Sequence, residues 1–188
     1  MPAQPKEIEI KFFINNHRAL ANRLKAAGFR LQTRRTHEIN TLYDFPNQAL
    51  RKRGELLRLR KYGPLWVLTH KAKGKKGRHK VRVETETTVG DGQKMEAILR
   101  ALGYKPSFRY EKFRAEWTDG TGHVVVDETP IGNYGEIEGP SGWIDRTARA
   151  LAIPPEQYIV LNYADLFLDW KRRTRNRASE MTFQAIKK

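Results

Sequence analysis

The stretch EIEIKFF, residues 7–13, alternates between charged and apolar side chains. Strict alternation over this length predicts a β-strand with one charged face and one apolar face. The direction of the charged face decides the fold. If it faces water, the strand belongs to an ordinary sandwich. If it faces inward, the protein has a charged interior, and such an interior requires a ligand or counter-ion.

The chain has 188 residues, of which 39% are hydrophobic and 30% charged, and its net charge is +15. This length suits one domain with a core, or one domain with a helical appendage. The basic balance favours an anionic partner such as nucleic acid, acidic lipid or polyphosphate. The chain has no cysteine, which excludes disulfides and thiolate chemistry.

The two ends of the chain are polar. The amino-terminal MPAQPKEIE is too polar for a signal peptide, and no apolar run approaches membrane-spanning length. We therefore expect a soluble cytoplasmic protein that does not associate with membranes. Residues 171–188 hold seven Lys or Arg and one Glu, a net charge of +6. We expect residues 1–170 to form a single domain and 171–188 a polar basic tail without structure of its own.

Eight stretches of alternating polarity predict β-strands. The strands are expected at about 6–14, at a stretch ending with 39–45, and at 55–62, 65–73, 80–89, 110–117, 123–128 and 134–139. Helical spacing of apolar residues occurs at 15–28, 90–103, 141–153 and 155–173, and residues 46–54 predict a turn or short helix. The pattern predicts an α+β fold, an eight-stranded antiparallel β-barrel with flanking helices and a C-terminal helical segment.

Two features predict that the charged faces of these strands point inward. Their side chains are almost all fully charged, with few Ser, Thr, Asn or Gln. The helices at 15–28 and 90–103 carry apolar stripes that must pack on the apolar face of the sheet. Helices on the outside leave the charged face inside, where an eight-stranded barrel has room for about one small ligand. The alternative is a barrel with an apolar core and solvated charges.

Two outward-facing residues and one loop need a separate interpretation. Trp66 and His70 have the opposite parity to Lys71 in their strand, so both are predicted to face outward, Trp66 beneath a helix. The loop KAKGKKGRHK, residues 71–80, is dense in charge. It is interpreted either as a solvated loop or as a lid that steers an incoming anion.

The predicted inward face combines acids and bases. The carboxylates are Glu7, Glu9, Glu84, Glu86, Asp127, Glu136 and Glu138. The bases are Lys11, Arg58, Arg60, Lys71, Arg82, Lys112 and Arg114. Carboxylates two residues apart on a strand suit a hard divalent cation. Arginines two apart suit a chain of phosphates through bidentate donors. A metal ion together with a polyphosphate would satisfy both sets.

At this level of detail the sequence resembles the CYTH superfamily, the triphosphate tunnel metalloenzymes. The family includes class IV adenylate cyclases, thiamine triphosphatases and inorganic tripolyphosphatases. Its Glu-x-Glu-x-Lys signature corresponds to EIEIK, and further elements correspond to LYDF, LLRLRK, a Lys in the next strand, RVETE, EKFRAEW, an Asp that closes a strand, and GEIEG. The late NYADLF is similar to a Ser-Tyr-x-x-Leu stretch, with Asn162 in place of Ser. The resemblance covers about residues 5–170.

The resemblance implies an eight-stranded tunnel, a Mg²⁺ or Mn²⁺ site, and a triphosphate lying along the bases. The residues implied for the metal are Glu7, Glu9, Asp127, Glu136 and Glu138. Those implied for phosphate are Lys11, Arg58, Arg60, Lys71, Lys112 and Arg114, with Arg82 on the same face. Glu84 or Glu86 is expected to hold a second metal or to orient water, and Lys71 joins them in the catalytic set. Tyr43 and Asp44 match a motif without an assigned role.

Three functions are consistent with these residues. The first is metal-dependent hydrolysis of a small triphosphate, either tripolyphosphate or an organic triphosphate. The second is a class IV adenylate cyclase, which makes cyclic AMP and pyrophosphate from ATP. The third is a polyphosphate or nucleic-acid binding module, which the paired carboxylates disfavour because they repel a polyanion. A homodimer is left open.

Overall fold

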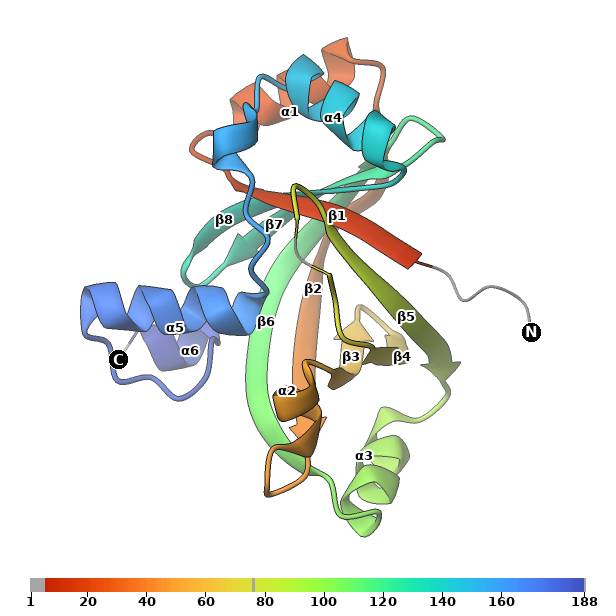
Figure 1. Cartoon of the computed structure of the whole chain (residues 1–188), viewed down its shortest axis with the longest axis vertical. Helices are drawn as coiled ribbons and strands as arrows, with labels where there is room; N and C mark the ends of the chain where they lie inside the picture. The colour runs from red at the N-terminus through yellow and green to blue at the C-terminus, as the bar shows by residue number, and fades with distance from the viewer. Residues whose placement is uncertain (1–5, 76, 188) are drawn as a thin grey trace.

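Eight antiparallel strands close into a barrel in the computed structural model, which describes residues 6–75 and 77–187. The strands are β1 (Lys6–Phe13), β2 (Arg30–Asp44), β3 (Leu56–Tyr62), β4 (Leu65–Lys71), β5 (Lys80–Val89), β6 (Lys105–Thr118), β7 (His123–Thr129) and β8 (Gly132–Glu138). Around the barrel they follow the order β1-β5-β4-β3-β2-β6-β7-β8, and β8 pairs with β1 (Figure 1). The predicted fold class is confirmed. The extreme N-terminal residues 1–5, Lys76 of the charged loop and Lys188 of the predicted tail lie outside the described residues.

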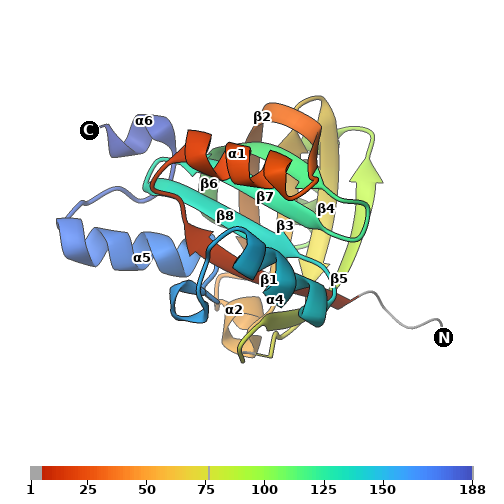
Figure 2. The same ribbon diagram turned by 90° about the horizontal axis from the view of Figure 1, so that it is seen from above.

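Helices pack on the outside of this barrel. They are α1 (His17–Ala26), α2 (Ala49–Arg53), α3 (Gly92–Ala101), α4 (Ser141–Ala150), the 3₁₀ turn η1 (Pro155–Gln157), α5 (Tyr163–Thr174) and α6 (Phe183–Ile186). Seen from above, α1 and α4 lie across the strands at the β1–β8 side (Figure 2). No helix in the described ranges is long and apolar enough to cross a membrane.

The apolar face of β1 points outward into a core beneath α1 and α4. Ile10 is 0% exposed, and it belongs to the same cluster of buried residues as Phe12 of β1, Leu24 of α1 and Ile144 of α4. The alternate residues of β1 point into the barrel. The facing argument is therefore confirmed: helices cover the apolar exterior and the charged residues are enclosed.

The helix α3 covers the outer face of β3 and β4. Leu59 of β3 and Leu99 of α3 are both buried in one cluster, and Trp66 packs against it. The first residue of α3, Gly92, lies so close to Trp66 that a Cβ there would come within 2.1 Å of the indole ring. Trp66 thus packs under a helix, as predicted, and His70 faces outward with a side chain that is 45% exposed.

Local hydrogen bonds explain where the helices begin. The Asn16 side chain accepts from the first turn of α1 and Asp91 accepts from the first turn of α3, as the capping signals predict. Asp44 has a similar role, because its carboxylate accepts the backbone N–H groups of Leu50 and Arg51 at 2.9 and 3.0 Å. The Asp of the LYDF motif therefore fixes α2 at the end of β2.

Three elements differ from the prediction. β6 begins earlier than expected, at Lys105, and β2, for which the sequence predicted only the end, begins at Arg30; the two strands pair from Arg30↔Thr118 to Asp44↔Lys105, with register shifts between. The expected helix at 155–173 is interrupted, and Ile159 instead forms an antiparallel bridge to Lys11. α5 begins only at Tyr163, where the Asn162 side chain accepts a hydrogen bond from the backbone of the first turn.

The expectation of an unstructured tail from residue 171 is wrong for the described residues. α5 continues to Thr174, and Met181 is 0% exposed. The Met181 backbone forms a parallel bridge beside Tyr110, with hydrogen bonds of 3.0 and 3.1 Å to β6. β7 pairs with β6 only from Phe113 onward, so the C-terminal segment covers the preceding edge of β6. Figure 1 shows α5 and α6 beside this strand.

We expect Met181→Ala to lower the free energy of unfolding by about 2–5 kcal/mol, the usual range for truncating a fully buried Met. Urea unfolding followed by circular dichroism measures this change. Lys187→Ala is the control, because an exposed side chain in the same segment changes stability by roughly 0.5 kcal/mol or less. Equal stability of Met181→Ala and the wild type would show that the segment is not packed on the barrel.

Candidate active site

A cavity of about 1580 Å³ occupies the barrel interior. Its walls carry the charged faces of the strands, together with Tyr163 and Asp165 from the first turn of α5. Drug-sized ligands occupy pockets of about 300–1,000 Å³, so the interior has room for a ligand larger than a single phosphate. Apart from Asp127, every residue that the sequence assigned to catalysis, phosphate or metal lines this cavity.

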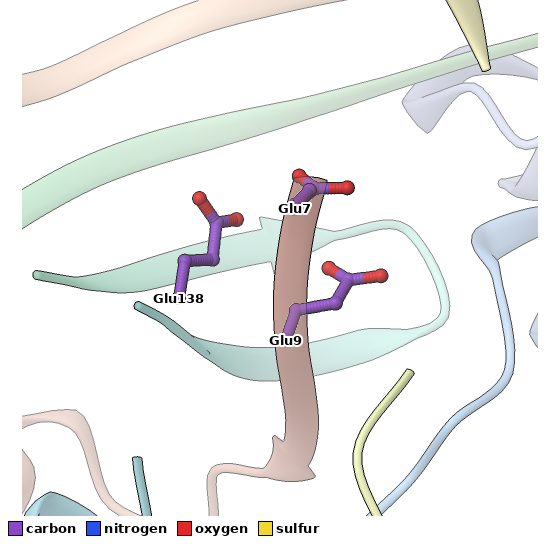
Figure 3. A group of neighbouring side chains, drawn as sticks. All are labelled: Glu7, Glu9 and Glu138. Carbon is purple, nitrogen blue, oxygen red and sulfur yellow. The ribbon is translucent and has the colours of Figure 1, made fainter. Parts of the chain in front are cut away.

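Three of the predicted metal ligands lie together. Glu7 and Glu9 of β1 and Glu138 of β8 each offer a carboxylate oxygen, and these oxygens lie within 4.8 Å of one another (Figure 3). Glu9 and Glu138 are partners in the β1–β8 register, and Glu7 is two residues away on the same face. We call Glu7, Glu9 and Glu138 the carboxylate triad.

Glu138 is the member of the carboxylate triad that lacks a basic partner within ion-pair distance among the described residues. Burial and the negative charges of Glu136 and Glu7 raise the pKa of Glu138 well above its ordinary value. Burial also opposes ionisation of Glu7, but a hydrogen bond from Glu84 and the charge of Lys71 lower its pKa to about 2. Three carboxylate oxygens that converge on one point suit a hard divalent cation such as Mg²⁺ or Mn²⁺, and such a cation would favour the ionised form of Glu138.

Asp127 and Glu136, the other two predicted metal ligands, are engaged differently. The Asp127 carboxylate is 0% exposed and accepts from Lys112 at 2.8 Å, from Arg114 at 2.7 and 2.8 Å, and from the Tyr163 hydroxyl at 2.6 Å. Glu136 accepts from Arg114 at 2.7 Å and lies 3.3 Å from Lys11. In this arrangement both carboxylates hold basic side chains in place and lie outside the triad.

The predicted phosphate-binding residues fall into two groups. Lys11, Lys71, Lys112 and Arg114 are ion-paired with carboxylates at 3.1 Å or less. The second group, which we call the arginine row, consists of Arg58, Arg60 and Arg82. Each of these has a buried Nε atom without a hydrogen-bond partner among the described residues. Arg60 is closest to carboxylates, at 3.9 Å from Glu38 and Glu86.

The predicted catalytic residues Glu84, Glu86 and Lys71 lie on neighbouring strands. The Lys71 ammonium contacts Glu84 and lies 3.1 Å from Glu7, so it links β4 to β5 and β1. Burial and a hydrogen bond shared with Glu7 raise the pKa of Glu84 to about 7. Glu86 is 51% exposed at its side chain and accepts from Thr69 at 3.3 Å.

Sequence reasoning missed four interior residues. Glu38 is 0% exposed; burial opposes its ionisation, but the charges of Lys112 and Arg114 lower its pKa to about 2. The others are Asn40, which donates a hydrogen bond to Glu38, Lys80, which donates one to Glu9, and His123, the register partner of Glu138. The period of two could have found Glu38, Asn40 and Lys80, had the strand alternation been extended by one or two steps.

The charged loop at residues 71–80 meets the cavity at both of its ends. Lys73 and Gly74 line the cavity after β4, and Lys80 lines it at the start of β5. The His79 ring lies 2.9 Å from Asp145 of α4, which fixes the end of the loop to the helical layer. The loop therefore borders the cavity, while Lys73, Lys75 and Arg78 are exposed as in a solvated loop, and its role in steering an anion stays a prediction.

A closed barrel with an apolar exterior and an interior of paired acids and bases defines a charged tunnel. Residues 5–153 match the CYTH domain, and the chain belongs to this family. The resemblance drawn from the motifs is thus confirmed. The sequence has no significant match among curated proteins.

Solved structures share this fold. A candidate adenylate cyclase from Vibrio parahaemolyticus matches with a TM-score of 0.78 and 19% identity, over 88% of this chain and 99% of that one. A Pyrococcus horikoshii protein matches with a TM-score of 0.73 and 21% identity, over 87% of this chain and 98% of that one. A candidate adenylyl cyclase from Hippeastrum matches with a TM-score of 0.64 and 20% identity, over 87% of this chain and 95% of that one. That protein is described as having a dominant triphosphatase activity. At these identities the likeness establishes the fold.

The raised pKa of Glu84 predicts a pH dependence of stability. Because its folded-state pKa of about 7 exceeds the ordinary 4.5, the folded chain binds more protons than the unfolded chain between these values. The free energy of unfolding therefore falls as the pH rises from about 4.5 to about 7. Glu84→Gln removes this contribution, so we expect the variant to gain stability relative to the wild type at pH 8 but not at pH 5.

Urea unfolding at both pH values in the presence of EDTA measures this difference. Glu156→Gln, an exposed carboxyl in η1, serves as the matched control and should behave alike at the two pH values. A gain by Glu84→Gln that is the same at pH 5 and pH 8 would contradict the assignment.

Proposed function

We propose that this chain hydrolyses a small triphosphate inside the barrel with the help of a divalent metal ion. One observation carries the proposal: the arginine row and the carboxylate triad line the same cavity, and each set keeps unpaired groups among the described residues. These are the buried Nε atoms of the arginine row and the Glu138 carboxylate, which has no basic partner within ion-pair distance. A triphosphate supplies acceptors to the first set, and a divalent cation supplies positive charge to the second. The triphosphatase activity described for the Hippeastrum structure supports the same choice.

The arginine row binds the phosphate chain in this proposal. Arg58 and Arg60 lie two residues apart on the inward face of β3, and Arg82 approaches from β5. Guanidinium groups donate two parallel hydrogen bonds to phosphate oxygens and remain charged at every physiological pH. They orient the terminal phosphate and stabilise the charge that develops on the leaving oxygen.

The carboxylate triad would hold Mg²⁺ or Mn²⁺, which when bound neutralises phosphate charge. Asp127 and Glu136 keep Lys112 and Arg114 in fixed positions beside it.

Glu84 is the residue best suited to accept a proton from water. A carboxyl whose pKa is about 7 is half ionised near neutral pH, where general-base catalysis is most effective. The water oxygen attacks the terminal phosphorus, the phosphoanhydride bond to the leaving diphosphate breaks, and the water proton passes to Glu84. Lys71, in contact with Glu84, holds the carboxylate in place. Glu86 is half exposed and is therefore less suited to this role, because a solvated carboxylate is a weaker base than a buried one.

Adenylate cyclase activity is the second candidate, because the cavity volume accommodates a nucleotide. Incubation with Mg²⁺ or Mn²⁺ and either tripolyphosphate, ATP or thiamine triphosphate separates the candidates when the products are identified by ³¹P NMR. Release of phosphate from any of the three is the expected result. Cyclic AMP with pyrophosphate from ATP would replace the proposal by the cyclase. Tight, salt-dependent RNA binding without turnover would replace it by a binding module.

Arg60→Ala should weaken tripolyphosphate binding by roughly thirtyfold, because it removes a charge-assisted contact worth about 2 kcal/mol. Isothermal titration and the ligand-induced shift of the melting temperature both measure this loss. Arg100→Ala is the matched control: it removes the same charge from the exposed face of α3, where Arg100 pairs with Glu96. If both variants bind as the wild type does, Arg60 does not contact phosphate and the proposed binding mode is wrong.

A further inference from the structure

Glu9 of the carboxylate triad is held by two ammonium groups. Lys11 Nζ lies 2.7 Å from one carboxylate oxygen, and Lys80 Nζ lies 2.5 Å from the other. Lys80 is the register partner of Glu9 across the β1–β5 pair and is only 7% exposed. Both oxygens of Glu9 therefore already face a cation supplied by the chain.

The two lysines are not equivalent. Lys11 belongs to the EIEIK signature and also lies 3.3 Å from Glu136, so two carboxylates hold it. Lys80 lies within ion-pair distance of Glu9 alone among the described residues. The backbone before it is fixed, because the neighbouring His79 ring lies 2.9 Å from Asp145. Only the flexible side chain of Lys80 must move to release the Glu9 oxygen that it contacts.

A divalent cation and the Lys80 ammonium need the same lone pairs. Metal ligation requires an unprotonated carboxylate oxygen that points at the ion, and an ammonium at 2.5 Å takes that direction and adds a repelling charge. Glu138 has no basic partner within ion-pair distance among the described residues, and Glu7 is paired with Lys71 at 3.1 Å. Glu9 alone of the carboxylate triad has an ammonium group on each of its two oxygens, so competition with a metal is strongest there.

We propose that Lys80 is a resident cation that competes with the divalent metal for Glu9. The metal then binds the free protein weakly, through Glu7 and Glu138, and gains Glu9 when Lys80 moves to another anion, such as a phosphate oxygen in the same cavity. Lys80 is in this sense a residue that sets metal affinity. The inference rests on the metal site of the proposed function but does not require any particular reaction.

Mn²⁺ binding to the free protein, without any triphosphate, tests this inference. Electron paramagnetic resonance of unbound Mn²⁺ gives the affinity and the number of ions. We expect Lys80→Met to bind Mn²⁺ at least about tenfold more tightly than the wild type, since a neighbouring opposite charge typically alters a carboxylate's affinity for a proton by ten- to a thousandfold. Lys80→Arg keeps the cation and should bind as weakly as the wild type.

Lys73→Met is the matched control. It removes the same charge from the wall of the same cavity, but Lys73 has no ion pair with the carboxylate triad in the described structure. An equal gain from Lys73→Met would assign the effect to net charge and overturn the competition. Weaker binding by Lys80→Met would overturn it as well, because it would make Lys80 a support of the site.

Two further measurements keep the outcome decisive. Melting temperatures establish that each variant is folded, and Lys80→Gln replaces Lys80→Met if the methionine variant is not. Absence of Mn²⁺ binding in the wild type, in the neutral Lys80 variant and in Lys73→Met would overturn the inference together with the carboxylate site. The product assays and Arg60→Ala test the hydrolase separately, so turnover with unchanged Mn²⁺ affinity in Lys80→Met would reject only the role of Lys80.

Discussion

Most charges enclosed by the barrel have an oppositely charged partner, and the structure depends on the ion-pair network that these partners form. Asp127 is 0% exposed and accepts from Lys112, Arg114 and Tyr163. Burying an unpaired ion costs several kcal/mol, and removing one partner of a buried pair leaves the other uncompensated. Paired acids and bases therefore make up most of the interior, whereas the buried Nε atoms of the arginine row and the Glu138 carboxylate lack such partners among the described residues. The apolar faces are displaced to the exterior, where α1, α3 and α4 must cover them.

The C-terminal segment takes part in the same network. The Tyr163 hydroxyl, at the first turn of α5, donates a hydrogen bond to Asp127. Ile159 forms a backbone bridge to Lys11 of β1, and Met181 forms one to Tyr110 of β6. These contacts place residues beyond 155 against the interior and against strand edges that the barrel's own pairing leaves uncovered. The segment thus contributes both to closure of the barrel and to the position of the bases, which a polar appendage would not do.

The sequence predicted the fold well because facing in a strand depends on a period of two, which local residues display. EIEIK and LLRLRK place their charged side chains correctly without knowledge of any partner. Pairing inside the barrel depends on the register between strands far apart in the sequence. The contacts of Asp127 with Lys112 and of Lys80 with Glu9 follow from such registers. The packing of the C-terminal segment was missed because its apolar residues, Met181, Ala178 and Ile186, are scattered through a charged stretch without a strand or helix period.

The division of the bases into two groups has an energetic consequence for any anionic ligand. Lys112 and Arg114 must exchange a carboxylate for a phosphate, so the contact they gain is offset by the one they lose. The arginine row has no such contact to give up at its buried Nε atoms, and each new charged hydrogen bond there is worth roughly 1.5–3 kcal/mol. Affinity for a phosphate chain should accordingly come from the arginine row. The paired bases should contribute less, because each contact that they make with a phosphate replaces one with a carboxylate.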